Sequence, residues 1–178
     1  MRSELDFIWQ RRSVRSFTDR ELTGDEFREL LEAAMAAPSA CGCDPWEFVV
    51  VNDKNMRQKM AAVLPNGQFL NHCGGAIIIC GNSAKAHTGS LSYMLQDCAA
   101  AMENILLAAP ALGLGACWLG VHPREERITQ LRQLFSIPEN ITPFGACAIG
   151  EPAVPAVPRT RYDAARVHGE SWDEEVVL

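Results

Sequence analysis

The sequence predicts a single α+β domain over residues 1–178, in which helices flank a sheet of short buried strands. The first observation is composition: 48% of the 178 residues are hydrophobic, which is enough for one substantial core. The second is that helical patterns alternate along the chain with short apolar runs. The third lies near the end, where Pro152, Pro155 and Pro158 disfavour regular structure, so residues 151–178 are expected to form an extended C-terminal arm.

The predicted helices follow from capping signals and from apolar residues at helical spacing. Thr23 followed by Glu26 is a capping box, and apolar residues then recur as far as Pro38, which predicts a helix over residues 23–37. Pro110 removes a backbone donor inside the longest helical pattern, so we expect a kink or an early end there. The remaining helices are expected over residues 55–64, over 90–112 with Gly113 as its cap, and over 123–135 with His122 as its N-cap.

The predicted strands are short apolar runs, many of them rich in β-branched residues, over residues 48–51, 76–80, 116–119 and 146–149. A dinucleotide-binding fold is disfavoured, because Gly113 and Gly115 follow a helix and precede a strand. The phosphate-binding glycine turn of that fold follows a strand and precedes a helix. Trp118 also stands where the third glycine of that turn belongs.

The charge balance excludes several classes of partner. The net charge is -6 at pH 7, whereas proteins that bind duplex nucleic acid usually carry an excess of Lys and Arg, so we expect no nucleic-acid partner. No apolar run approaches the length of a membrane span, and the first residues lack the apolar core of a secretory signal. We therefore expect a cytoplasmic protein with no membrane partner.

The cysteines and histidines do not predict a metal site. The seven cysteines are an odd number and most stand in apolar runs, so we interpret them as reduced core residues. Cys41-Gly42-Cys43 would suit metal or redox chemistry, but one residue separates the pair and no second pair follows at ligand spacing. The four histidines are scattered and lie in no nucleophile motif. We expect no metal and no catalytic histidine.

The strongest functional signal is the basic segment Arg11-Arg12-Ser13-Val14-Arg15-Ser16-Phe17, which concentrates positive charge in an acidic chain. Guanidinium groups bind phosphate oxygens in bidentate geometry, and serine hydroxyls add short donors. The segment therefore predicts a site for a small anion. A solvated basic turn before a helix is the alternative interpretation.

A second candidate segment covers residues 37–46, a loop of small residues between a predicted helix and a predicted strand. Pro38 and Pro45 stiffen this loop, and Trp46 closes its end. Small side chains let backbone N–H and C=O groups approach the edge of a planar heterocycle, so the loop suits a flat ring. An ordinary connection between a helix and a strand is the alternative.

Together these segments resemble the FMN-dependent nitroreductase family over nearly the whole chain. The family's opening motif, Arg-Arg-Ser-(Ile/Val)-Arg-x-(Phe/Tyr), is matched from Arg11 to Phe17. Its proline-bounded loop, Ala-Pro-Ser-x-x-Asn-x-Gln-Pro-Trp-x-Phe, is matched in part from Ala37 to Phe48. Its alanine-rich helix, its Leu-Gly-Leu-Gly-x-Cys-Trp-x-Gly run and its Ile-Gly-x-Pro motif are matched over residues 96–109, 112–120 and 149–152.

The resemblance implies a mixed, mainly antiparallel sheet and an intertwined homodimer with one FMN in each of two interfacial clefts. By this resemblance, Arg11, Arg12 and Ser13 would hold the FMN phosphate and ribityl chain. Arg159 and Arg161 would form a second phosphate clamp. The implied contacts to the flavin ring are Arg15 near its pyrimidine end, Pro38, Ser39 and Ala40 from the neighbouring subunit, Gln68 through its amide, and Leu119 and Gly120 through backbone groups.

The activity implied by the resemblance is oxidoreduction. NADH or NADPH would leave a hydride on flavin N5, and a small electron-poor acceptor such as a nitroaromatic or quinone would take it, with no catalytic side chain. Gly42 stands where the family has Asn, and Asp44 stands where it has Gln, so two amide contacts are lost and a carboxylate is gained. Open alternatives are reductive dehalogenation or flavin cleavage on the same scaffold, a non-catalytic FMN-binding protein, and a structural dimer.

Overall fold

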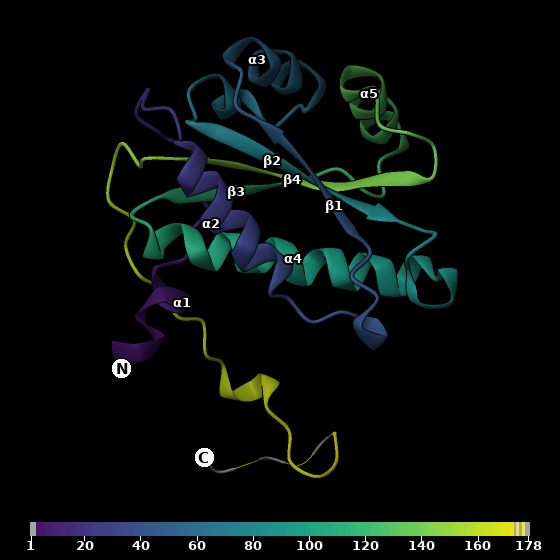
Figure 1. The fold of residues 1–178 in the computed structure, drawn as a ribbon. Coiled ribbons are helices and arrows are strands. Elements are labelled where there is room, and N and C mark those ends of the chain that lie inside the picture. The colour runs from purple at the N-terminus through teal and green to yellow at the C-terminus, as the bar shows by residue number, and fades with distance from the viewer. Residues whose placement is uncertain (1–2, 173, 175, 177–178) are drawn as a thin grey trace.

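The computed structural model describes residues 3–172, 174 and 176, and contains every predicted helix and strand (Figure 1). In chain order the elements are α1 (Asp6–Gln10), α2 (Gly24–Met35), β1 (Trp46–Val51), α3 (Lys54–Val63), β2 (Gly75–Asn82), α4 (Leu91–Ala111), β3 (Gly115–Gly120), α5 (Glu125–Phe135) and β4 (Ile141–Gly150). Short 3₁₀ turns lie at Ser3–Leu5, Ala40–Gly42, Gln68–Asn71, His87–Gly89 and Ala164–Arg166. α1 has no counterpart among the predicted helices.

The sheet has the strand order β1-β2-β4-β3, and each neighbouring pair of strands is antiparallel. β2 and β4 are therefore central, whereas β1 and β3 are edge strands. Among the residues that the structure describes, parallel pairing is limited to one bridge, between Ser13 and Ala116 on the outer edge of β3. The predicted α+β fold with a mixed, mainly antiparallel sheet is confirmed.

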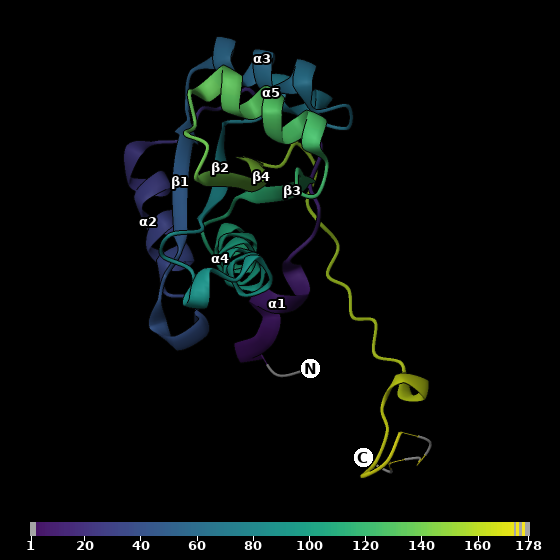
Figure 2. The same cartoon turned by 90° about the vertical axis from the view of Figure 1, so that its right-hand side faces the viewer.

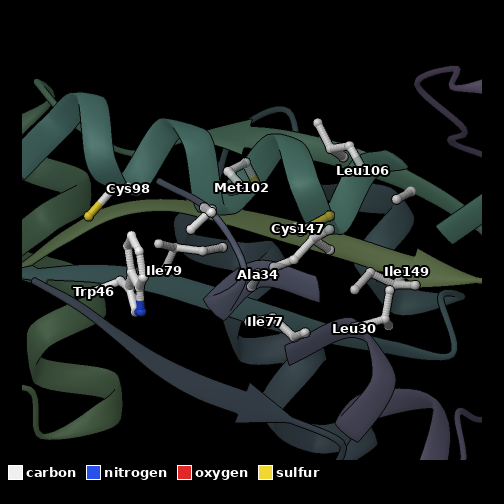
Figure 3. Close-up of a cluster of buried hydrophobic side chains, with 14 of the residues drawn as sticks. Leu30, Ala34, Trp46, Ile77, Ile79, Cys98, Met102, Leu106, Cys147 and Ile149 are labelled. Atoms are coloured by element: carbon white, nitrogen blue, oxygen red, sulfur yellow. The ribbon is translucent and has the colours of Figure 1, made fainter. Parts of the chain in front are cut away.

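Helices cover both faces of the sheet. Side chains alternate along β2, so that Ile77 and Ile79 point to one face and Ile78 and Cys80 to the other. The first pair packs against α2 and α4 in the cluster that Figure 3 shows around Met102. The second pair packs beneath α3 and α5, which Figure 2 shows on the opposite side of the sheet from α4. Each of these four side chains is at most 1% exposed, so the middle of β2 is buried on both faces.

The helix ends confirm most of the capping predictions. Thr23 Oγ1 accepts a hydrogen bond from the Glu26 N–H, and the Glu26 carboxylate accepts one from the Thr23 N–H, so the capping box is present. α4 ends at Ala111, one residue after Pro110. Gly113 then takes the left-handed conformation (φ 73°), which suits a helix C-terminus. Pro110 lies inside α4, and Leu112 is the C-cap, so the helix end predicted at residues 112–113 is confirmed and no early end occurs at Pro110.

The N-cap prediction for the last helix is wrong. α5 begins at Glu125, and Arg124 rather than His122 occupies the N-cap position. Pro123 likewise precedes the helix instead of opening it. The His122 N–H donates to the carbonyl of Phe144 (3.0 Å), which prolongs the pairing of β3 with β4 and keeps the chain extended at this point.

The described residues contain neither a membrane-spanning helix nor a metal-binding cluster. No helix among them is both long and apolar enough to span a bilayer. No group of three or more His, Cys, Asp or Glu side chains among them is placed to hold a metal ion.

Candidate functional site

The two ends of the chain run side by side at the outer edge of β3. The Val14 N–H donates to the carbonyl of Ala116 (3.0 Å), which docks the basic segment on this strand. Four hydrogen bonds then join the basic segment and its flanking residues to the start of the C-terminal arm. The arm donates two of them, from the Arg159 N–H to the Trp9 carbonyl (3.0 Å) and from the Ala153 N–H to the Ser16 carbonyl (3.0 Å). The N-terminal residues donate the other two, from Arg12 Nη1 to the Val157 carbonyl (2.7 Å) and from the Thr18 N–H to the Glu151 carbonyl (2.9 Å). Segments far apart in the sequence therefore lie against each other (Figure 2).

This pairing brings together three of the predicted phosphate-binding arginines. The pKa of Arg159 is lowered, first by the positive charge of Arg161 and then by partial desolvation and the charge of Arg12. Among the described residues, Arg159 and Arg161 have no carboxylate at ion-pair distance. Like charges held together in this way favour a bound anion that neutralises them.

Arg11 faces α4 instead. Its Nε lies 3.7 Å from Oε1 of Glu103, and both side chains are partly exposed. Burial raises the pKa of Glu103, and the charge of Arg11 opposes that rise. Arg11 therefore ties the basic segment to α4, and it lines neither of the hollows beside Arg12 described next.

Two hollows open beside Arg12. One, of about 300 Å³, lies between residues 12–16 of the basic segment and residues 154–157 of the arm, so that Ser13 and Arg15 share it with Arg12. The other, of about 250 Å³, lies at the C-terminal end of α4 and includes Pro110 in its lining. Both hollows have guanidinium or hydroxyl donors at their edge, together with apolar walls from the proline-rich arm.

Arg15 also borders a third hollow, of about 170 Å³, at the end of β3. Leu119 and Gly120 line this hollow, so three predicted ring-binding residues meet there. Gln68 does not line it, since its Nε2 faces the carbonyl of Ala61 at 3.5 Å. The other residues that line it are Leu64, Asn66, Phe69, Cys117, Trp118 and Arg127.

Three residues that line this hollow were not predicted from the sequence: Asn66, Phe69 and Arg127. Arg127 Nη1 donates to the carbonyl of Gly120 (2.6 Å), which brings a cation from α5 to the end of β3. An arginine on the polar side of an amphipathic helix gives no functional signal, because such residues are common there. Asn66 had a weak signal, since it precedes the Gly67-Gln68 pair that the family resemblance marks.

The proline-bounded loop lies elsewhere on the same chain. The Ala40 N–H donates to Oδ1 of Asp97 on α4 (2.9 Å). Pro110, beside the basic segment, is thirteen residues further along α4, which corresponds to roughly 20 Å along a helix. Within one chain, the structure therefore keeps Pro38, Ser39 and Ala40 away from Arg12 and its hollows, whereas Arg11 contacts α4 closer to them, at Glu103 (Figure 1).

Two polar residues inside this loop, Ser39 and Asp44, form hydrogen bonds with each other. The Asp44 N–H donates to Ser39 Oγ (3.0 Å), and the Ser39 hydroxyl donates to the Asp44 carboxylate. Asp97, which holds the loop, is 5% exposed, and its Oδ2 is buried with no hydrogen-bond partner among the described residues. The loop is thus fixed from α4, and Asp44 is directed at Ser39 rather than outward.

Comparison with known proteins gives one consistent result. The nitroreductase family profile matches residues 8–68 and 59–151. A protein of Archaeoglobus fulgidus, named "Putative NADH dehydrogenase/NAD(P)H nitroreductase", is 42% identical over 171 residues, which cover 94% of this chain and 98% of the relative. A crystal structure from Bacteroides thetaiotaomicron with the same name is 39% identical, with a TM-score of 0.90 over 97% of this chain and 99% of that chain.

A third relative was solved with a ligand. It comes from Desulfovibrio desulfuricans, was crystallised in complex with FMN, and is 30% identical with a TM-score of 0.81 over 97% of this chain and 99% of that chain. The matches include both the basic segment on β3 and the sheet that supports it. The chain therefore belongs to the nitroreductase family.

Proposed function

We propose that this chain is an FMN-dependent oxidoreductase that takes a hydride from NADH or NADPH and delivers it to a small electron-poor acceptor, such as a nitroaromatic or a quinone. Family membership supports the reaction type, the FMN complex of the Desulfovibrio relative supports the cofactor, and the name of the Archaeoglobus relative supports the electron donor. The observation that carries the proposal is the docking of the arm on the N-terminal segment, where Arg12 Nη1 donates to the Val157 carbonyl (2.7 Å) and the Arg159 N–H donates to the Trp9 carbonyl (3.0 Å).

The residues present fit the phosphate end of FMN. A phosphate monoester carries up to two negative charges and several acceptor oxygens, and guanidinium groups bind it with charge-assisted hydrogen bonds. Arg12, Arg159 and Arg161 would supply these donors, and Ser13 would add a hydroxyl from the shared hollow. Arg11 would also bind the anion after leaving Glu103, because the contact between these two side chains is long (3.7 Å from Nε to Oε1).

The hollow at the end of β3 suits the flavin ring. Arg15 would place a cation near the pyrimidine end, where it favours the anionic reduced ring. Leu119 and Gly120 would offer backbone groups, and Arg127 would hold the Gly120 carbonyl in place. Gln68 would have to turn away from Ala61 to reach a ring, which its weak 3.5 Å contact permits. FMN, when bound, supplies the hydride-accepting and hydride-donating chemistry, so no side chain needs to act as a nucleophile.

A homodimer would complete the site. Ala40 is held at Asp97, about 20 Å along α4 from Pro110 and the hollow beside Arg12, so Pro38, Ser39 and Ala40 would contact the ring bound by the other subunit. Large apolar side chains are exposed on α1 and on the arm, which extends away from the sheet (Figure 1). A partner subunit would bury them. The most exposed of these side chains are Ile8 (44%), Val154 (68%), Val157 (75%), Tyr162 (69%) and Trp172 (78%).

Rapid mixing under anaerobic conditions tests the proposed function. The purified protein reconstituted with FMN should lose its absorbance near 450 nm when mixed with NADH or NADPH, and a quinone or nitroaromatic should restore it. Flavin that stays oxidised at millimolar NADH and NADPH would favour a non-catalytic FMN-binding protein. A protein that remains colourless after incubation with FMN would contradict the proposal altogether.

A further inference from the structure

Two of the seven cysteines differ from the rest in their surroundings. Five are buried in the core, and burial raises their thiol pKa values, to about 12 for Cys80 and Cys98. Cys41 is exposed and Cys43 is half-buried. Because the thiolate is the reactive form of cysteine, thiol chemistry under native conditions is confined to this pair. The buried cysteines are Cys73, Cys80, Cys98, Cys117 and Cys147.

Cys41 and Cys43 lie on one tight turn. The Cys43 N–H donates to the carbonyl of Ala40 (3.2 Å), and the Gly42 N–H donates to the carbonyl of Ser39 (3.1 Å). Cys41 and Gly42 both have positive φ angles, of 52° and 64°. Two residues of chain span at most about 7 Å between Cα atoms, and a turn shortens that span into the range of disulfides. The Cα atoms of the two cysteines therefore lie within the range that a disulfide spans.

An imidazole stands beside one of these thiols. His87 Nε2 lies 3.9 Å from Cys41 Sγ, across the gap between the turn after α2 and the turn before α4. The ring of Tyr93 contacts the His87 ring edge-on at a centroid distance of 5.5 Å, which limits the orientations of the imidazole. A histidine at this position can accept the thiol proton, as the base does in cysteine nucleophiles.

We propose that Cys41-Gly42-Cys43 is a redox-active dithiol that exchanges with small-molecule disulfides. Cys41, after giving its proton to His87, attacks one sulfur of a disulfide R–S–S–R, and one R–S⁻ leaves. Cys43 then attacks the Cys41 sulfur of the mixed disulfide, which releases the second R–S⁻ and closes the Cys41–Cys43 bond. The two leaving thiolates take up the two protons given up by the cysteines, so one disulfide is reduced as the protein dithiol is oxidised.

The disulfide formed in this way is a labile one. One intervening residue makes a strained ring, and strained or exposed disulfides are reduced more easily than structural ones. Excess disulfide in the surroundings should therefore oxidise the pair, and excess thiol should reduce it again. Its chemistry needs no flavin, so it stands or falls independently of the proposed oxidoreductase activity.

The test uses the reduced full-length protein, glutathione disulfide as the probe, and intact-mass measurement after acid quench and alkylation of free thiols. Wild-type protein should lose two alkylatable thiols without retaining an adduct. The Cys43→Ser variant should stop at a stable mixed disulfide with glutathione, and the Cys41→Ser variant should react at least tenfold more slowly. The His87→Gln variant should also react at least tenfold more slowly than wild type at neutral pH.

Cys98→Ser is the matched control, because it removes a buried cysteine. This variant should lose two alkylatable thiols on reaction with glutathione disulfide, as wild type does. Far-UV circular dichroism of each variant separates loss of reactivity from loss of fold. A wild-type protein that keeps all seven alkylatable thiols would overturn the proposal. A stable glutathione adduct on wild type would overturn it as well, because Cys43 would then not close the bond. The FMN-free protein should give all of these outcomes, because no step of the exchange needs the flavin.

Discussion

A substitution at Arg161 tests the phosphate site directly. Its side chain is exposed, so the substitution should not disturb the core, and its positive charge lowers the pKa of the neighbouring Arg159. Arg161→Gln removes one cation from the cluster. A hydrogen bond to a charged group is worth about 1.5–3 kcal/mol, and about 1.4 kcal/mol corresponds to a tenfold change in affinity. The Kd for FMN should therefore rise about 10- to 150-fold. The FMN-free protein should be no less stable than wild type, because the substitution relieves repulsion on Arg159.

The assay is a fluorescence titration of FMN with FMN-free protein at low and high salt. Arg166→Gln is the matched control: it lies in the same exposed arm, changes the net charge equally, and in the structure pairs with Asp163 (Nε to Oδ2, 3.1 Å). We expect this variant to bind FMN within about threefold of wild type, because an exposed ion pair contributes little. Added salt should weaken wild-type binding more than Arg161→Gln binding.

Two results would refute this reasoning. Equal weakening in Arg161→Gln and Arg166→Gln would mean that overall charge, not a local phosphate contact, sets the affinity. Unchanged affinity in Arg161→Gln would remove the end of the arm from the phosphate site.

Two further predictions concern stability. Hydrogen bonds from Arg20 hold the pKa of Glu26 at about 2, below its usual 4.5, so this carboxylate stabilises the fold above about pH 4.5 and the contribution is lost as the pH falls towards 2. Urea unfolding should show Glu26→Gln less stable than wild type by about 1–2 kcal/mol at pH 7 and equally stable near pH 2. A Cβ on Gly115 would lie 2.7 Å from the Val14 side chain, so Gly115→Ala should cost about 1–3 kcal/mol in the same assay and weaken FMN binding. An unchanged urea midpoint for Gly115→Ala, or a Glu26→Gln deficit that does not depend on pH, would contradict the respective argument.

The fold could be predicted in large part because its signals are local. The capping box at Thr23, the proline and glycine at the end of α4 and the apolar strand runs each act over a few residues, and each is present in the structure. His122 was assigned wrongly because its N–H bonds to Phe144, a partner 22 residues away that no local pattern reveals. Long-range hydrogen bonds of this kind decide where an extended segment ends.

The site was only partly predictable. The basic segment and Arg159 could be assigned to one phosphate site only through the family resemblance, because nothing in the sequence places residue 12 beside residue 157. Arg127 could not be predicted, since its role depends on α5 packing beside the end of β3. The loop at Pro38 is the opposite case. The sequence marks it as part of the site, yet the fold of one chain keeps it away from Arg12 and the hollows beside it.

The separation of loop and arginines makes a mixed dimer the most direct test of the central claim that each site draws on two chains. One subunit carries Arg12→Ala and Arg161→Gln, and the other carries Ala40→Trp; the two are co-expressed with different affinity tags and purified through both. If each site takes its arginines from one chain and its loop from the other, one cleft of the mixed dimer contains both sets of substitutions and the other cleft contains neither. The mixed dimer should then bind one FMN, whereas neither parent dimer should bind FMN. A mixed dimer that binds no more FMN than its parents would place each site within a single chain and contradict the account.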